Sequence, residues 1–170
     1  MRRFAVVTLF VFLASFTVTP SARQALPPIP AKPGVAAGTV QAGTLTITLT
    51  HAYVGLQEDG LYQVVLTDAP LPVAAVPVEV KSRGGQRLLR TAQISGISLL
   101  VDDKGFIRNI IPFIGKDLRG SNMLASAGSL AAFTASAASV TGQGSVKADD
   151  TGVKKWSYSA SWNAVPVAVK

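Results

Sequence analysis

The sequence predicts an all-β fold, an antiparallel β-sandwich of about seven to nine strands with one short helix. Residues 44–50 alternate strictly between threonine and an aliphatic residue, as a half-buried strand does. Short apolar runs recur along the chain, and turn signals that close on glycine separate several of them. A small closed β-barrel is the alternative fold, because the small residues that are abundant after Ser126 would fit the interior of a barrel.

The composition is that of a chain that folds around a core. Of the 170 residues, 48% are hydrophobic and 15% are charged, which favours one folded domain over disorder. The chain has no cysteine, so it can form no disulfide and carry no lipid on cysteine. Residues 26–170 hold 13 Lys or Arg against 9 Asp or Glu, a balance that favours anionic surfaces but falls short of a nucleic-acid footprint.

The first 25 residues have the layout of a secretory signal peptide. Arg2 and Arg3 precede an apolar run from Phe4 to Val18, and Pro20 follows among small residues. The run is shorter than the ~20 apolar residues that cross a bilayer, so we expect cleavage, with an uncleaved anchor as the alternative. The sequence thus predicts export by the general secretory route, to the periplasm or the medium, with no membrane span in the mature form.

After this leader, the sequence predicts a linker and then one domain. Residues 26–37, LPPIPAKPGVAA, hold four of the ten prolines and show no hydrophobic period, so we expect an extended linker. The single β-sandwich domain is expected at 38–170. Its first strand, at 44–50, places Leu45, Ile47 and Leu49 on one face.

Residues 50–68 predict a hairpin. The turn residues QEDG at 57–60 are followed by a run in which Tyr62, Val64 and Leu66 share a face. Residues 68–77 contain three prolines, which predicts a loop or a crossing rather than an interior strand. The short helix is expected at 84–95, with Gly96 beyond its end.

Two further hairpins are predicted from turns of like sequence. The turn DDKG at 102–105 joins apolar runs at 97–101 and 106–114, and its glycine suits a positive φ. The turn DDTG at 149–152 precedes a strand that contains both tryptophans. The small residues at 125–145 allow a helix ending near Phe133 or a weakly specified strand, and we favour a strand from Phe133 onward.

The histidine at position 51 is the only one in the chain. In an unbroken strand it would point to the same side as Leu49, whereas a bulge near Thr50 would reverse this and bring Ala52 and Val54 inward. Zinc needs three or four nitrogen, sulfur or carboxylate ligands, and the chain offers no second histidine and no cysteine, so we expect no metal and no cofactor. A structural role is favoured for His51, and a small hydrolase with His51 as its base is the alternative.

The carboxylates are better explained by turns than by catalysis. Four of the nine form the pairs Asp102-Asp103 and Asp149-Asp150 within predicted turns, where aspartate bonds its own backbone. No motif of a nucleophilic serine, such as G-x-S-x-G, occurs in the sequence. The sequence therefore predicts a protein that is not an enzyme.

Two groups of residues are candidates for ligand binding. Arg83, Arg87 and Arg90 would lie along one side of the predicted helix, with Lys81 nearby, and could meet an anionic envelope component or a polysaccharide. A solvated helix face is nevertheless the favoured interpretation of this stripe. The second group, on the last long strand, comprises Trp156, Tyr158 and Trp162.

These three aromatic residues share one side of their strand, opposite Ser157, Ser159 and Ser161. A polar face opposite an aromatic one is typical of a strand packed on a core, which is the favoured interpretation. An exposed row would instead predict a carbohydrate-binding module. The leading hypothesis for function is an exported, non-catalytic protein of the cell envelope, or a secreted one, that acts by binding.

Overall fold

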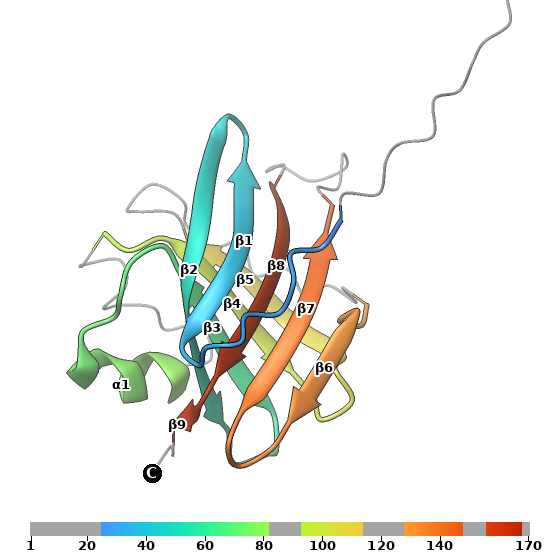
Figure 1. The fold of residues 1–170 in the computed structure, drawn as a ribbon. Coiled ribbons are helices and arrows are strands. Elements are labelled where there is room, and N and C mark those ends of the chain that lie inside the picture. Colours follow the sequence, from blue (N-terminus) through green and yellow to red (C-terminus); the bar gives the residue numbers. More distant parts are fainter. Residues whose placement is uncertain (1–24, 82–92, 114–127, 148–155, 168–170) are drawn as a thin grey trace, which may run out of the picture.

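The computed structural model describes residues 25–81, 93–113, 128–147 and 156–167. They form nine strands, one 3₁₀ turn and one α-helix (Figure 1). In chain order the elements are β1 (Val35–Ala42), β2 (Leu45–Leu56), β3 (Tyr62–Thr67), η1 (Val73–Ala75), α1 (Val76–Lys81), β4 (Gly96–Val101), β5 (Ile107–Phe113), β6 (Ala132–Ala135), β7 (Val140–Val146), β8 (Trp156–Ala164) and β9 (Pro166–Val167).

The strands form one curled antiparallel sheet. Its order is β5-β4-β3-β2-β1-β8-β7-β6, and the short β9 adds to β2 as the single parallel pair. The prediction of an antiparallel all-β fold is confirmed, but the two layers of the sandwich belong to one continuous sheet. The reason is that β1 is hydrogen-bonded to β2 on one side and to β8 on the other, so it joins the two layers.

The two edge strands come close at one end of the sheet. Phe106 and Ser129 form an antiparallel bridge, and the Ile107 N–H donates to the Gly128 carbonyl at 3.0 Å. Beside them, the Leu130 N–H donates to the Gly105 carbonyl at 2.9 Å. The sheet is therefore curled almost to closure there, which gives it some of the character of the alternative barrel.

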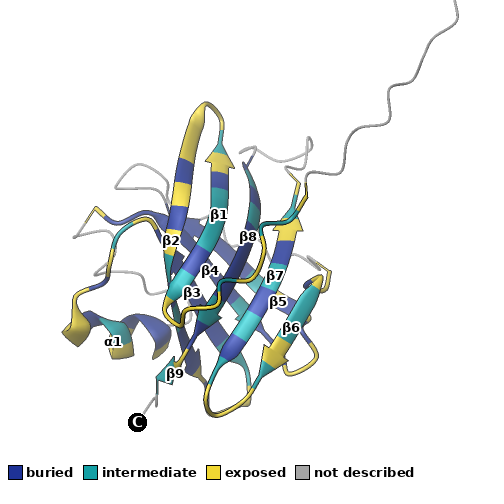
Figure 2. Ribbon diagram, in the orientation of Figure 1, coloured by how far each residue is buried: buried dark blue, intermediate teal, exposed yellow. Residues whose placement is uncertain are grey.

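The core lies inside the curl, between β3–β5 and the layer of β1, β8 and β7 (Figure 2). Trp156, Tyr158 and Trp162 all point into it, which confirms the core interpretation of these rings. The Trp162 ring covers its cross-strand partner Gly142, where an added Cβ would lie only 2.1 Å from the ring. Glycine on β7 therefore makes the room that the large rings on β8 need.

The hairpins predicted from turn residues are present. β2 pairs with β3 across the turn that contains Gly60, whose φ is +80°. β4 pairs with β5 across the turn that ends at Gly105, also with φ +80°. β7 pairs with β8, although their connection at 149–152 lies outside the described residues. The strand expected from Phe133 onward is present as β6 and β7.

The helix in the described residues lies at a different position from the one that the sequence predicts. α1 begins at Val76, in the segment where we predicted a loop, whereas most of the predicted helix at 84–95 lies outside the described residues. Pro77 is the second residue of α1, a position where the missing N–H removes no intrahelical hydrogen bond. Proline content therefore excluded a strand here, as expected, but it did not exclude a helix.

α1 covers a second, smaller apolar cluster on the outer side of the sheet. Val80 of α1 packs there with Val65 of β3 and Phe113 at the end of β5, together with Leu71 and Ile94. The Gln57 side-chain amide donates to the Val80 carbonyl, which ties the helix to the end of β2. β3 is thus buried on both faces.

Candidate functional site

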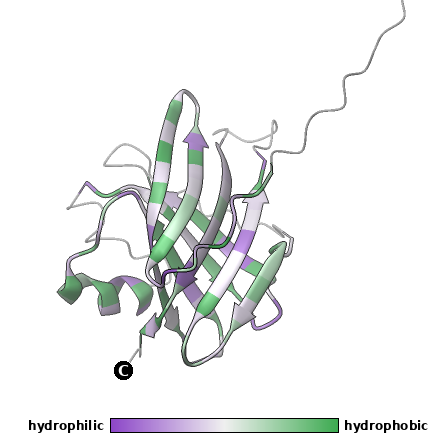
Figure 3. Ribbon diagram, in the orientation of Figure 1, coloured by the Kyte–Doolittle hydropathy of each residue, from purple (hydrophilic) through white to green (hydrophobic). Residues whose placement is uncertain are grey.

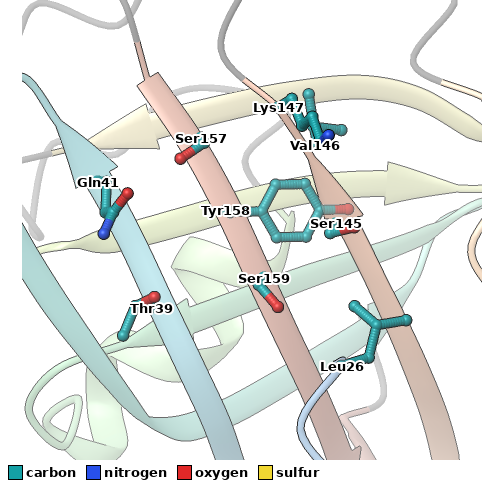
Figure 4. A pocket seen from close by; sticks show the side chains of 9 residues that line it. All are labelled: Leu26, Thr39, Gln41, Ser145, Val146, Lys147, Ser157, Tyr158 and Ser159. Carbon is teal, nitrogen blue, oxygen red and sulfur yellow. The ribbon is translucent and has the colours of Figure 1, made fainter. Parts of the chain in front are cut away.

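An open groove of about 400 Å³ lies on the outer face of β1, β8 and β7, the face that points away from the core (Figure 4). Most of its lining consists of hydroxyl and amide side chains. The lining residues are Leu26, Thr39, Gln41, Ser145, Val146, Lys147, Ser157, Tyr158 and Ser159. The ring of Tyr158 itself lies on the core side of β8.

Strand periodicity explains why hydroxyl side chains line the groove. On β8 the even positions hold the buried aromatic and alanine residues, so the serines at 157 and 159 point outward. Thr39 pairs with Ser159 across β1 and β8, and Ser159 pairs with Ser145 across β8 and β7. Side chains directly opposite on adjacent strands lie about 4.5–5.5 Å apart at Cβ, so these three hydroxyls form one row across the groove.

The groove carries positive charge and no negative charge from its lining. Lys147 stands at the end of β7, next to Val146, and it is exposed. No aspartate or glutamate is among the lining residues. Hydroxyl and amide groups can both donate and accept hydrogen bonds, so the groove suits a ligand that offers many hydroxyl or carboxylate oxygens.

One wall of the groove belongs to a segment that we call the strap, residues 25–34. The sequence predicts an extended linker at 26–37, but the strap lies across β8 and β7, residues 31–34 form a bend and a turn, and 35–37 already belong to β1 (Figure 1). Gln143 Nε2 donates to the Pro27 carbonyl at 2.7 Å, and Ser161 Oγ donates to the Pro28 carbonyl at 2.7 Å. Asn163 Nδ2 donates to the carbonyls of Pro30 and Ala31 at 3.1 and 3.2 Å.

The strap and the groove share one strip of outward side chains on β7 and β8. Gln143, Ser161 and Asn163 hold the strap, and Ser145, Ser157 and Ser159 continue the strip into the groove. Prolines lack an N–H, so a proline-rich segment offers carbonyl acceptors with few donors, which matches the side-chain donors of the strip. The outer face of β7 and β8 therefore already holds a proline-rich segment of the same chain through side-chain hydrogen bonds.

His51 lies at the point where β2 changes which of its sides faces the core. Ile47 and Leu49 point inward, but farther along Ala52 and Val54 do so, as in the bulged alternative. Opposite Thr50, β1 has one extra residue, because Val35 pairs with His51 while Gly38 pairs with Leu49. His51 is consequently half-buried, off the core face.

The hydrogen bonds of His51 do not activate a nucleophile. Its Nδ1 lies 2.8 Å from Thr50 Oγ1, and that hydroxyl donates to the Asp68 carbonyl at 3.0 Å. A hydroxyl has one proton, so the imidazole is the donor to Thr50. The Asp68 carboxylate accepts from the Ser95 N–H at 2.9 Å. A hydrolase with His51 as its base stays a prediction that this geometry does not support.

The structure describes the two candidate tryptophans but not the three candidate arginines. Arg83, Arg87 and Arg90 lie outside the described residues, so their role stays a prediction. Trp156 and Trp162 are only 6% and 0% exposed. Buried rings of this kind do not offer a surface for stacking on a sugar, so a carbohydrate-binding module built on them stays a prediction that this geometry does not support.

The carboxylate of Asp102 accepts hydrogen bonds from backbone groups of its own turn, as the sequence predicts for an aspartate at this position. Its Oδ1 accepts from the N–H groups of Lys104 and Phe106 at 3.0 and 2.9 Å, and its Oδ2 accepts from Arg108 Nη2 at 2.7 Å. Burial by itself raises the pKa of this carboxyl, but the hydrogen bonds from Phe106, Arg108 and Lys104 outweigh burial and hold the pKa below its usual value. Asp149 and Asp150 lie outside the described residues.

The described part of the chain contains neither a cluster of metal-ligating side chains nor a helix that could cross a membrane. Among the described residues, no three His, Asp or Glu side chains gather closely enough to hold a metal ion. In the same part of the chain, no helix has the length and apolar content that a membrane crossing needs.

Comparison with protein-family models, with curated proteins and with solved structures gives no match for the chain. The groove was not found from the sequence because it combines three strands and a segment more than 100 residues away from two of them. The one signal for it in the sequence was the polar row Ser157, Ser159 and Ser161 opposite the aromatic residues.

Proposed function

We propose that this protein is an exported, non-catalytic protein of the cell envelope that binds an extended anionic polysaccharide along the groove on β1, β8 and β7. The observation that carries the proposal is the row of hydroxyls from Thr39, Ser159 and Ser145, with Lys147 at its end and no acidic side chain in the lining. The predicted signal peptide and the positive balance of residues 26–170 support the same assignment.

The chemistry of a polysaccharide fits this lining. Sugar hydroxyls donate and accept hydrogen bonds, as do serine, threonine and glutamine side chains. The carboxylates of an acidic sugar chain would pair with Lys147, and the long open shape of a sheet face suits a linear polymer. The strap supports the proposal as well, because it is an extended chain that outward donors on the same two strands already hold.

The test is affinity electrophoresis of the purified protein in gels that contain polygalacturonate or, as a neutral comparison, dextran. We expect retardation in polygalacturonate and none in dextran, with the retardation falling as the salt concentration rises. Equal retardation by both polymers, or none by polygalacturonate, would contradict the proposal.

Variants at the centre of the groove show where the polymer lies. Replacing Ser159 by Asp places a negative charge between Thr39 and Ser145 and should weaken binding by about tenfold or more. Replacing it by the neutral Asn is the matched control and should change binding far less. Equal binding by the two variants would place the polymer elsewhere on the protein.

Variants of Lys147 measure how much its positive charge contributes to polysaccharide binding. Replacing Lys147 by Gln should weaken binding by about two- to fivefold, as for an exposed ion pair. Replacing Lys104 by Gln, in the β4–β5 turn, removes the same charge from the molecule without touching the groove. If the two variants lose equal affinity, net charge rather than the groove explains the binding.

A further inference from the structure

The strap lies on a set of side-chain donors that we call the strap seat, namely Gln143, Ser161 and Asn163. Their bonds go to strap carbonyls at residues 27, 28, 30 and 31. The strands that carry the seat, β7 and β8, are mostly pale in Figure 3, whereas α1 is largely in the hydrophobic colour. The seat therefore holds an extended proline-rich segment by its backbone carbonyls, whichever copy of the protein supplies that segment.

Packing does not lock the strap in place. None of residues 25–34 is fully buried, and the large apolar side chain of Ile29 is 39% exposed. Hydrogen bonds from exposed or half-buried side chains to carbonyls can be replaced by bonds to water. The strap can consequently leave its seat while the sheet beneath it stays folded.

Two exposed residues, Lys32 and Pro33, form what we call the hinge. Before the hinge, the Ala31 carbonyl accepts from the side chain of Asn163 at 3.2 Å. After it, the Gly34 N–H donates to the Asn163 carbonyl at 2.8 Å, and the Gly34 carbonyl accepts from an N–H of β2 at 3.1 Å. Backbone bonds to β8 and β2 thus fix Gly34, so the hinge can open without disturbing β1.

The composition of the hinge favours a straight path. In the structure the strap runs over β7 and β8, and the chain then turns back into β1 (Figure 1). Proline fixes its own φ at about −65° and biases the residue before it, here Lys32, toward extended backbone. A straight hinge would carry residues 25–31 away from their own domain by as much as roughly 23 Å. This length is enough to bring them onto the strap seat of a second copy.

We propose that two copies of this protein exchange straps, so that residues 25–31 of each copy occupy the strap seat of the other. The exchange is reciprocal and therefore closes as a dimer. It uses the same hydrogen bonds as the single copy, so it needs no further complementary surface. Leu26 of the strap lines the groove, so in the dimer each groove takes one wall from the partner copy. The proposal does not depend on polysaccharide binding.

A pair of cysteines tests which copy holds the strap, because the chain has no cysteine of its own. Ser161 Oγ lies 2.7 Å from the Pro28 carbonyl oxygen, which brings these two residues within reach of a disulfide. In the variant Pro28→Cys/Ser161→Cys, a strap in its own seat forms an intrachain disulfide, and an exchanged strap forms a covalent dimer on a non-reducing gel. We expect the dimer to increase with protein concentration and to dominate at about 1 mM, the effective concentration of a short tether. Intrachain disulfides alone at every concentration would overturn the proposal.

The matched control is the variant Thr39→Cys/Ser159→Cys. These residues are cross-strand partners on the same outer face, on β1 and β8, which stay together when the hinge opens. This pair should form intrachain disulfides only. As much covalent dimer from the control pair as from the strap pair would mean random cross-linking, and the proposal would fail.

Removing the hinge gives a second measurement that needs no cysteine. Without Lys32 and Pro33, residues Ala31 and Gly34 become neighbours, so the chain cannot reverse and the strap reaches only the seat of another copy. Light scattering should then show a dimer at micromolar concentration. Inserting Gly-Ser-Gly after Pro33 instead lengthens the hinge flexibly and should leave the protein a monomer under the same conditions. A monomeric hinge-deleted variant, or equal dimerisation of the two variants, would contradict strap exchange.

Discussion

Two segments cover the outer side of the sheet, and they are held in opposite ways. Over β3 and the end of β5, α1 is held by apolar packing, through side chains such as Val80, Val65 and Phe113. Over β8 and β7, the strap is held by hydrogen bonds from the side chains of Gln143, Ser161 and Asn163 and, at its end, by a backbone bond from the Gly34 N–H to the Asn163 carbonyl at 2.8 Å; none of its residues is fully buried.

This difference follows from the outward residues of the strands beneath. An outward valine or phenylalanine gains about 1.5–3 kcal/mol when it is buried, so it needs a lasting cover. An outward serine or asparagine gains about 0.5–1.5 kcal/mol from a hydrogen bond that water can replace. We infer that α1 is a fixed part of the fold, whereas the strap can be released without unfolding the sheet.

The largest expected effect comes from removing the apolar cover. Replacing Phe113 by Ala should lower the free energy of unfolding by about 3–5 kcal/mol, because it leaves a cavity in the second apolar cluster. Chemical denaturation measures this change. Replacing Ile29 by Ala, in the strap, should change stability by less than about 0.5 kcal/mol. Similar losses in both variants would mean that the two covers do not differ.

Asp102 offers a third case for this comparison. Its buried carboxylate accepts hydrogen bonds from its own turn and from Arg108, and no covering segment among the described residues lies over it. Replacing it by Asn should lower the free energy of unfolding by about 1–3 kcal/mol near neutral pH. The pKa of Asp102 is lower in the folded protein than its ordinary value of 3.8, so the ionised carboxylate stabilises the folded state above that value. This contribution is lost as the pH falls through the lower, folded pKa.

The pH dependence is measured by urea denaturation at about pH 7 and at about pH 2. The difference between the Asp102→Asn variant and the parent protein should be large at the higher pH and small at the lower one. Asp103→Asn is the control, because Asp103 is exposed in the same turn, and its effect should stay within about 0.5 kcal/mol. A difference for Asp102 that does not change with pH would exclude the carboxylate charge as its cause.

Two tyrosines compare a paired hydroxyl under the apolar cover with an unpaired hydroxyl in the core. Under the apolar cover, the Tyr53 hydroxyl accepts from the Leu71 N–H at 2.8 Å, so Tyr53→Phe should destabilise by about 1–2 kcal/mol. On the inner side of β8, the buried Tyr158 hydroxyl has no hydrogen-bond partner among the described residues, and burial raises the pKa of Tyr158, so it stays neutral. Tyr158→Phe should therefore leave thermal stability unchanged or raise it.

The smallest effect on stability, and the most specific one, concerns the strap. Asn163→Asp replaces the amide donor with an acceptor that repels the carbonyls of Pro30 and Ala31, so the strap should come loose at a loss of less than about 1 kcal/mol. A nitroxide on Ile29→Cys should then become more mobile in electron paramagnetic resonance spectra, while one on Leu45→Cys should not. Unchanged mobility at position 29 would show that the side-chain hydrogen bonds do not hold the strap.

Strands and hairpins were predictable from the sequence, and the groove was not. The alternation at 44–50 and the glycines at 60 and 105 act over a few residues, so they indicate strands and turns without knowledge of the rest of the chain. The position of the strap could not be predicted from such local patterns, because the bonded residues Ser161 and Pro28 lie 133 residues apart. The proline run has no hydrophobic period that would indicate contact with a sheet.

What the sequence determined by itself is the antiparallel β-sheet and the side of β8 that faces the core, because the two-residue period of a strand and the turn chemistry of glycine are local properties. Only the tertiary structure decided that one curled sheet forms both layers, that β2 changes sides at Thr50, and that a proline-rich segment and three strands meet around a groove lined by hydroxyl groups. Each of these depends on which residue lies opposite which on a neighbouring strand, and that pairing is set when the strands come together.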